Sequence, residues 1–188
     1  MSSVNWPAVE DALWTWVQGT SGLAADHVVW AGQNQPSLSD PYIVMHIDVV
    51  RTIGLSDSIE LRTNPSPSPG QDIQQVARGQ RRCVLTLTCF TASPIGASNG
   101  KAILGDVLDS LALDPVYTPI SAAGIGIAHY DDIDAIEGVI NSTLLEPRAS
   151  TSVVFFVGSE IVVGIASIGT VNATDQIPTP AETFKIGV

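Results

Sequence analysis

The sequence predicts an α+β fold in which two main α-helices pack on a mixed or antiparallel β-sheet. From Arg82 onward, the segment 80–91 alternates between two faces, as a half-buried strand does. One of these faces carries Cys83, Leu85, Leu87 and Cys89. After a break at 93–96, apolar residues recur with the period of a helix from Ile103 to Leu111. A strand followed by a covering helix is therefore the folding unit that we expect.

The length and composition favour one domain that contacts other subunits. A chain of 188 residues can bury about 70% of its unfolded surface and needs no disulfide or metal to fold. Apolar residues make up 45% of it and charged residues 14%, which argues against disorder and leaves little charge to cover a monomer. We therefore treat 1–188 as a single domain, part of whose surface lies against other subunits.

The net charge of −11 disfavours an ordinary nucleic-acid-binding protein, because such proteins neutralise phosphates with clustered lysine and arginine. Solubility is the simpler explanation of this charge. The alternative is a channel through which DNA slides without binding, since the wall of such a channel has to be negatively charged.

The two cysteines, Cys83 and Cys89, are expected to be reduced core residues, because about 20 Å of extended strand separates them, several times the reach of a disulfide. The first residues lack the basic and apolar regions of a signal peptide, and the most apolar segment, 153–168, is interrupted at 158–160. We therefore expect no membrane contact, and a protein that acts in the cytosol or in a particle assembled there.

The chain begins with a predicted amphipathic helix over 5–18. Pro7 suits its first turn, and Gly19 ends it. Its apolar stripe consists of Val9, Leu13, Trp16 and Val17. We expect this stripe to pack in the core.

Two strands are predicted next, a short one over 27–31 and a longer one over 42–53. His46 lies in the longer strand, without the further ligands that a metal site requires. We interpret it, and likewise His27 and His129, as a hydrogen-bonded histidine and predict no metal site and no cofactor.

A proline-rich segment follows a short predicted strand over 55–62. Residues 63–79 are expected to form an extended arm, because closely spaced prolines remove hydrogen-bond donors and hold the backbone extended. These prolines are Pro65, Pro67 and Pro69. A connection of this length is either disordered or contacts something, and we predict contact with a neighbouring subunit.

Three arginines, Arg78, Arg81 and Arg82, lie close together in the sequence at the start of the predicted strand in the segment 80–91. They could bind phosphate. We favour pairing with carboxylates of the same or the next subunit, which makes them candidates for intersubunit contact.

The second predicted helix covers 98–113 and ends at Asp114-Pro115, because proline disfavours helix in the residue before it. Beyond it, Asp131, Asp132 and Asp134 form the one dense acidic run. The run lacks the glycine and glutamate of a calcium loop. It is either a turn between short strands or a set of carboxylates that face a lumen once several copies assemble.

The last ordered element is predicted to be a hairpin, with strands over 153–157 and 161–168 around a turn at Gly158-Ser159. Residues 172–188 contain two prolines and few packing residues, and we expect a tail that frays or lies on a partner.

Two parts of the chain resemble the tailed-phage neck terminator, or tail terminator, family. The first is the Trp30-Ala31 pair with the Gln-Asn-x-Pro turn at 33–36 and the Pro-Tyr-Ile sequence at 41–43, preceded by a helix. The second is the Glu-x-Arg-Ala sequence at 146–149 with the Ile-x-x-Ile strand at 165–168. The proline-rich arm has no counterpart in the family pattern.

The resemblance implies a structural virion protein and no enzyme. About six copies would form a ring that closes the tail tube and joins it to the head–tail connector. Its partners would be itself, the tail tube protein, the connector or adaptor proteins and passing double-stranded DNA. Asp131, Asp132 and Asp134 would then face the lumen, and Pro65, Pro67 and Pro69 would contact a partner.

Two other functions are weighed against this one. A tail-tube or connector-adaptor subunit of the same virion would also form rings, but a tube subunit would stack into long polymers. A small hydrolase is a remote alternative, because the sequence has no Gly-x-Ser-x-Gly or His-Glu-x-x-His motif and only three scattered histidines. An enzyme should have a deep polar pocket, and a ring subunit should expose flat apolar edges.

Overall fold

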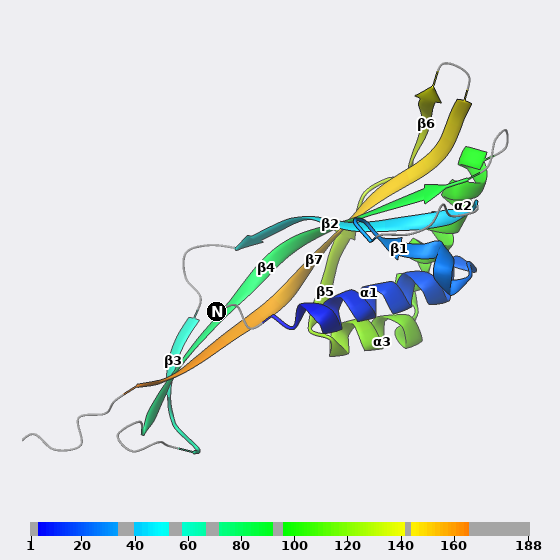
Figure 1. The fold of residues 1–188 in the computed structure, drawn as a ribbon. Coiled ribbons are helices and arrows are strands. Elements are labelled where there is room, and N and C mark those ends of the chain that lie inside the picture. Colours follow the sequence, from blue (N-terminus) through cyan, green and yellow to red (C-terminus); the bar gives the residue numbers. More distant parts are fainter. Residues whose placement is uncertain are drawn as a thin grey trace, which may run out of the picture.

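The structure is a computed structural model that describes residues 4–33, 40–52, 58–66, 72–91, 96–141 and 144–165 (Figure 1). Its helices are α1 (Trp6–Ser21), α2 (Gly96–Asp109) and α3 (Asp114–Ala122), with 3₁₀ turns at Ala25–His27 and Ser110–Ala112. Its strands are β1 (Val28–Trp30), β2 (Tyr42–Thr52), β3 (Ser58–Thr63), β4 (Ile73–Phe90), β5 (Ile125–Tyr130), β6 (Asp134–Asn141) and β7 (Leu144–Ile165). Predictions about 67–71, including Pro67 and Pro69, and about 172–188 lie outside the described residues.

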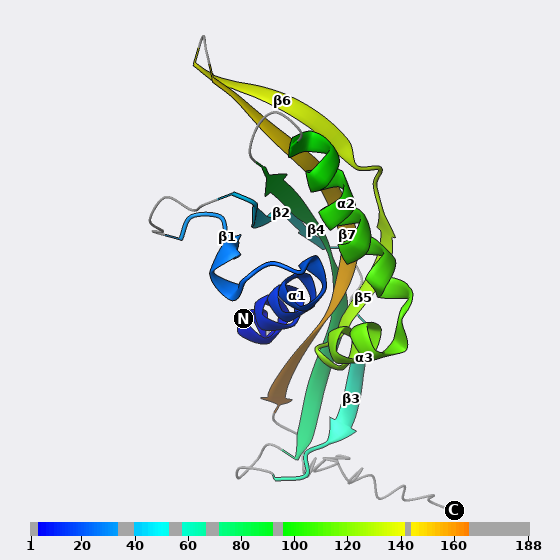
Figure 2. The ribbon, with the colours of Figure 1, turned by 90° about the vertical axis from the view of Figure 1, so that its right-hand side faces the viewer.

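The seven strands form one mixed sheet, so the predicted α+β class is confirmed. The strand order is β1-β2-β4-β7-β5, while β3 pairs with β4 and β6 pairs with β7. Among the strand pairs within the described residues, only β1–β2 is parallel. The sheet has its helices on one side (Figure 2).

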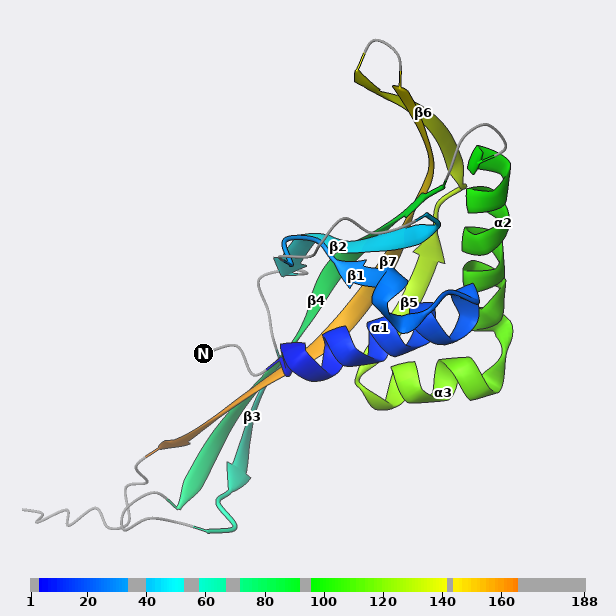
Figure 3. The same ribbon diagram turned by 45° about the vertical axis from the view of Figure 1, so that its right-hand side comes forward.

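The two central strands are much longer than the sequence predicts. β4 has 18 residues and β7 has 22, and they pair without interruption from Ile73 opposite Ile165 to Phe90 opposite Arg148. At about 3.3 Å per residue, the paired region is roughly 55–60 Å long. At one end β4 and β7 extend past α1 and α3, and at the other end β7 extends past α2 together with β6 (Figures 1 and 3).

The predicted hairpin turn at Gly158-Ser159 is wrong. Gly158 lies opposite Gln80 and Ser159 opposite Gly79, so β4 pairs with both residues and the strand continues. The predicted irregular segment also ends too late, because Ile73–Gly79 belongs to β4 and pairs with strands on both sides. The many polar residues of this segment obscure the alternation that is typical of a strand. Its pairing with β3 and β7 keeps the backbone extended.

The first helix is confirmed, and its C-terminal boundary is corrected. Val9, Leu13, Trp16 and Val17 are all buried, as the stripe predicts. The helix continues through Ser21 and ends at Gly22, which has a φ of 71° and so takes the left-handed conformation that favours glycine. The Asn5 side chain accepts a hydrogen bond from the backbone N–H of Ala8 at the other end.

A third helix, α3, begins where the second predicted helix ends. Leu113 is extended, with φ −95° and ψ 124°, and directly precedes Asp114, the first residue of α3. Proline is also favoured in the first turn of a helix, because its missing N–H has no partner there. Asp114-Pro115 therefore starts α3, and the predicted helix end at 113 is corrected, since α2 ends at Asp109 and is followed by the 3₁₀ turn Ser110–Ala112.

The core lies between the helices and the face of the sheet that they cover. The alternating residues of β4, from Cys83 to Cys89, have no exposed surface on this face. Both cysteines are free thiols, as predicted. On α2, Gly100 packs so closely on β7 that a Cβ added to it would lie 3.1 Å from the Cβ of Ala149.

Candidate assembly surfaces

The most prominent surface is on a three-stranded projection that we call the arm, formed by Ser58–Thr63, Ile73–Gln80 and Gly158–Ile165. It continues the sheet beyond α1 and α3 (Figure 3). It includes the strands on either side of the predicted proline arm, so the projecting segment is a regular sheet closed by the proline-rich connection.

One face of the arm is apolar. Side chains alternate along a strand, and directly opposite residues share a face. Because the β4–β7 register is unbroken, this face is the continuation of the buried face that carries Cys83 and Leu85. It carries the polar residues Thr63 and Gln75 among the apolar residues Ile59, Leu61, Ile73, Ala77, Ile161, Val163 and Ile165.

This apolar face is uncovered in the single chain. Ile59 is 65% exposed, Leu61 64% and Val163 52%. Monomeric soluble proteins rarely expose a contiguous apolar patch of this kind, and such patches mark interaction sites. The alternation of apolar and charged residues at 59–62 is the sequence signal that could have identified it.

The opposite face of the arm is charged and internally paired. Arg78 Nε donates to Glu160 Oε2 at 2.7 Å, and Arg78 Nη1 lies 3.6 Å from Glu60 Oε2. Arg62 Nη2 lies 3.0 Å from the same Glu60 oxygen. The hydrogen bond to Glu160 raises the pKa of Arg78, and it lowers the pKa of Glu160. Val162, which is 48% exposed, and the buried Val76 lie on the same face, so it combines ion pairs with apolar side chains.

The three predicted arginines do not form one cluster. Arg78 belongs to the charged face of the arm, where it pairs with Glu60 and Glu160 of the same chain. Arg82 lies directly opposite Arg51 on β2, on that same side of the sheet. Arg81 lies opposite Thr52 and Val157, so its position is on the helix-covered side, and its guanidinium donates to Gln80 O at 3.3 Å.

The base of the proline-rich connection is held by Asn64. Its backbone N–H donates to Asp72 O at 2.9 Å, and its Oδ1 accepts from the Gln74 side chain at 2.8 Å. Pro65 follows and is exposed. The connection therefore begins at a closed hairpin end, with Pro65 at the far end of the arm.

Asp131 and Asp132 lie in the connection between β5 and β6, and Asp134 is the first residue of β6, where it pairs with Ser150. Asp131, Asp132 and Asp134 are all exposed. The backbone at Asp131 is fixed by two hydrogen bonds, from its N–H to Ser152 O at 2.9 Å and from Thr151 Oγ1 to its carbonyl at 2.8 Å. Ile133 packs against the core. The turn therefore presents its carboxylates from an anchored backbone.

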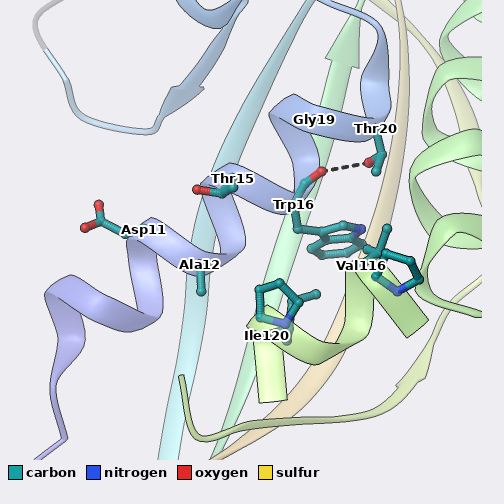
Figure 4. A pocket seen from close by; sticks show the side chains of 10 residues that line it. Asp11, Ala12, Thr15, Trp16, Gly19, Thr20, Val116 and Ile120 are labelled. Atoms are coloured by element: carbon teal, nitrogen blue, oxygen red, sulfur yellow. Dashed lines mark hydrogen bonds between the residues drawn. The ribbon is translucent and has the colours of Figure 1, made fainter. Parts of the chain in front are cut away.

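A second apolar surface is a groove between α1 and α3 (Figure 4). Its floor includes Trp16, which is 4% exposed, and Ile120, which is 1% exposed. The indole N–H of Trp16 donates to Val107 O at 3.2 Å and to Ser110 Oγ at 3.0 Å, which fixes the ring. The walls are Asp11, Ala12, Thr15, Gly19 and Thr20 on α1 and Pro115, Val116 and Pro119 on α3.

The arrangement around His46 does not form a hydrolytic site. His46 Nε2 lies 3.3 Å from Asp48 Oδ1, and Thr86 Oγ1 donates to the other oxygen of Asp48. A nucleophilic hydroxyl has to donate to the base, whereas here both groups contact the carboxylate. In the part of the chain that the structure describes, no three His, Cys, Asp or Glu residues are placed to hold a metal ion.

An elongated α+β subunit with a projecting, half-apolar arm has the features of a protein that assembles with copies or partners. The comparisons with known proteins agree with this class. The family model described as phage neck terminator protein matches residues 8–180, and the chain belongs to that family. A search of curated proteins found no match.

Membership confirms the resemblance inferred from the two motif regions. The protein is a structural protein of the phage neck, located in the virion, where it assembles with other tail and neck proteins. This family is not an enzyme family. Among the described residues, no helix is both long enough and apolar enough to cross a membrane.

Proposed function

We propose that about six copies of this chain form a closed ring at the neck, which ends the tail tube and joins it to the head–tail connector. The observation that carries the proposal is the arm. Its exposed apolar face requires cover, and it lies at one end of an elongated subunit, so the surface that it meets differs from itself. Head-to-tail contacts of this kind form a ring when the rotation between copies closes, and an open filament when it does not.

We also propose that the acidic turn faces the lumen of this ring. Asp131, Asp132 and Asp134 are exposed and anchored, and no phosphate-binding arginine lies within the turn. Carboxylates repel the phosphates of double-stranded DNA, so the genome would pass without binding. The tip of the arm, with Pro65, Pro67 and Pro69, is proposed to contact a neighbouring subunit or the tail tube.

The function is tested with phage that cannot make this chain. Without a terminator, heads and tails should accumulate separately, and tail tubes should vary in length; electron microscopy of lysates measures both. Complementation with the intact chain is the control. Normal joined virions in its absence would refute the proposal. A mutant that makes no tube at all would favour the tail-tube alternative.

The lumen assignment needs a separate experiment. Asp131→Lys, Asp132→Lys and Asp134→Lys, combined in one chain, should leave ring formation intact and reduce DNA passage, because the lumen would then attract phosphates. Packaged DNA and ejection efficiency are measured on purified virions. Replacement of the same residues by asparagine is the matched control, and normal ejection by the lysine variant would contradict the assignment.

A further inference from the structure

The arm has an open strand edge on each side. β3 pairs with β4 alone, and beyond the end of β5 the strand β7 pairs with β4 alone over 161–165. None of the other strands that the structure describes borders the outer side of either segment. The two edges are similar in length, with six residues in β3 and five in 161–165. A further strand can therefore be added to the arm on either side.

These two edges lack most of the features that prevent strand addition. Natural edge strands are protected by bulges, prolines, lysines or a covering helix. The β3–β4 and β4–β7 registers have no bulge in the arm, and 58–63 and 161–165 contain no proline or lysine. The charged residues of β3, Glu60 and Arg62, form an ion pair with each other. The arm also extends past α1 and α3 (Figure 3), so these helices do not cover its end.

On β7 the outward backbone groups belong to even-numbered residues. The N–H of Asp131, just after β5, donates to Ser152 O at 2.9 Å, so Ser152 uses the side of β7 away from β4. In an antiparallel pair, the backbone groups of successive residues point alternately toward the partner strand and away from it. Because the β4–β7 register is unbroken, the N–H and C=O groups of Val162 and Gly164 also point away from β4.

On β3 the outward backbone groups belong to odd-numbered residues. Asn64 N–H donates to Asp72 O at 2.9 Å, which directs the backbone groups of Asn64 toward β4. By the same alternation, the N–H and C=O groups of Ile59 and Leu61 point away from β4. Both edges of the arm therefore present donors and acceptors at alternate residues.

The strand directions decide how two arms can be joined. β3 and β7 both run antiparallel to β4, so they run parallel to each other. A second arm that points the same way therefore joins its β3 to the β7 edge of the first in a parallel pair. A second arm that points the opposite way joins two like edges in an antiparallel, two-fold pair. A head-to-tail contact requires the first arrangement, in which the two edges differ.

We infer that the β7 edge of the arm, 161–165, pairs in parallel with β3 of the adjacent copy, so that one sheet continues from arm to arm. The inference rests on the proposed ring and names the contact that builds it. Each copy uses its β7 edge on one side and its β3 edge on the other, which makes the contact heterologous. Backbone hydrogen bonds supply the affinity, as in other cases of strand addition.

The same register satisfies the backbone groups and the faces of the two arms. In a parallel pair, a residue with outward groups bonds to the two neighbours of the residue opposite it. With Val162 opposite Glu60 of the adjacent copy, its backbone groups meet those of Ile59 and Leu61. Val162 and Glu60 both lie on the charged face. Val163 then lies beside Leu61 on the apolar face, and each covers part of the other.

Cross-linking between two variants tests the pairing. Leu61→Cys in one copy and Val163→Cys in another should be joined by a short bismaleimide in virions from cells that express both variants. The matched control is Ser58→Cys, which lies on the opposite face of β3 and should not be joined to Val163→Cys. Cys83 and Cys89 are buried and should not react.

A second pair of variants tests the outward N–H group itself. Val162→Pro removes a donor that β4 does not use, and proline is tolerated in an edge strand at such a position. The single chain should stay folded, as thermal unfolding measures. Its share in virions, relative to the co-expressed unaltered chain, should fall about ten- to one-hundredfold, because a buried acceptor of the adjacent copy loses its donor. Val162→Thr keeps the N–H group and should be incorporated like the unaltered chain.

The outcomes separate the pairing from the function. Virions that contain the chain but show no cross-link between positions 61 and 163 would refute the pairing alone. A cross-link between two copies of position 163 would indicate a two-fold contact, and one from position 163 to another virion protein would assign the edge to that protein; both contradict the pairing. Equal incorporation of Val162→Pro and Val162→Thr would contradict it as well. A chain absent from virions would refute the proposed function.

Discussion

The two buried thiols make stability depend on alkaline pH. Burial raises the pKa of Cys83 to about 11 and that of Cys89 to about 12, from an ordinary value of 9.0. Above pH 9 the unfolded chain therefore releases protons that the folded chain keeps. The contribution of the neutral thiols to stability is complete below pH 9 and is lost as the pH rises through 11.

We expect the urea midpoint of the single chain to fall between pH 9 and pH 11. A chain with Cys83→Ala and Cys89→Ala should be less stable at neutral pH, because the substitutions leave cavities, but its midpoint should fall less steeply over that interval. If the urea midpoints of the two chains fell equally steeply with pH, the pH dependence could not be assigned to these two thiols.

Trp16 connects α1 to the end of α2 through its indole N–H, which has two acceptors, Val107 O and Ser110 Oγ. Trp16→Phe keeps an aromatic ring but removes the donor, so we expect a loss of about 1–3 kcal/mol in the free energy of unfolding. Chemical denaturation measures it. Ser110→Ala removes only one acceptor and should cost less. Equal stability of Trp16→Phe and the unaltered chain would show that the hydrogen bonds do not contribute.

At the level of elements, two glycines of α2 should respond in opposite directions. Gly100 faces Ala149 on β7 with no room for a Cβ, and Gly100→Val should destabilise the chain by about 1–3 kcal/mol through overpacking. At Gly105 an added Cβ would have its nearest neighbour, Ile133 Cδ1, at 4.0 Å. Gly105→Ala should therefore stabilise the helix by up to about 1 kcal/mol. Thermal unfolding measures the stability of both variants. A change of the same sign in both would contradict the packing described around these two glycines.

The tip of the arm can be shortened without loss of its register. Asn64 and Asp72 are already joined by a backbone hydrogen bond, so residues 65–71 can be replaced by Asn-Gly, which favours a two-residue hairpin turn. We expect the unfolding temperature of the single chain to stay nearly constant and assembly of the neck to weaken. Loss of the cooperative transition would contradict the view that this segment serves contact and not folding.

Elements with a local periodicity could be predicted from the sequence. The stripe of α1 and the buried face of β4 repeat over several turns or residue pairs, and both are found as expected. The continuity of β7 could not be predicted, because Gly158-Ser159 has the local chemistry of a turn and only its pairing with β4 keeps it extended. α3 was missed for a related reason, since Pro115 can both end and begin a helix.

At the scale of the whole molecule, the sequence indicates the net charge but not its segregation. The −11 total hides acidic helices, with five carboxylates and one lysine, and an arm whose two arginines and two glutamates balance. The alternation at 59–62 indicates an apolar face, but its exposure could not be predicted, because exposure depends on where the helical layer stops. The low charge content predicts subunit contacts, and the exposed apolar face of the arm is the surface that we propose for them.

The number of copies per virion tests the proposed ring most directly. Quantitative mass spectrometry with labelled peptide standards can compare this chain with the major tail tube protein in purified particles. The account predicts about six copies per particle, the number that one closed ring at the neck requires. A count that rises with tail length to many tens of copies would identify a tube subunit, and a count near zero would remove the chain from the virion; either result would contradict the account.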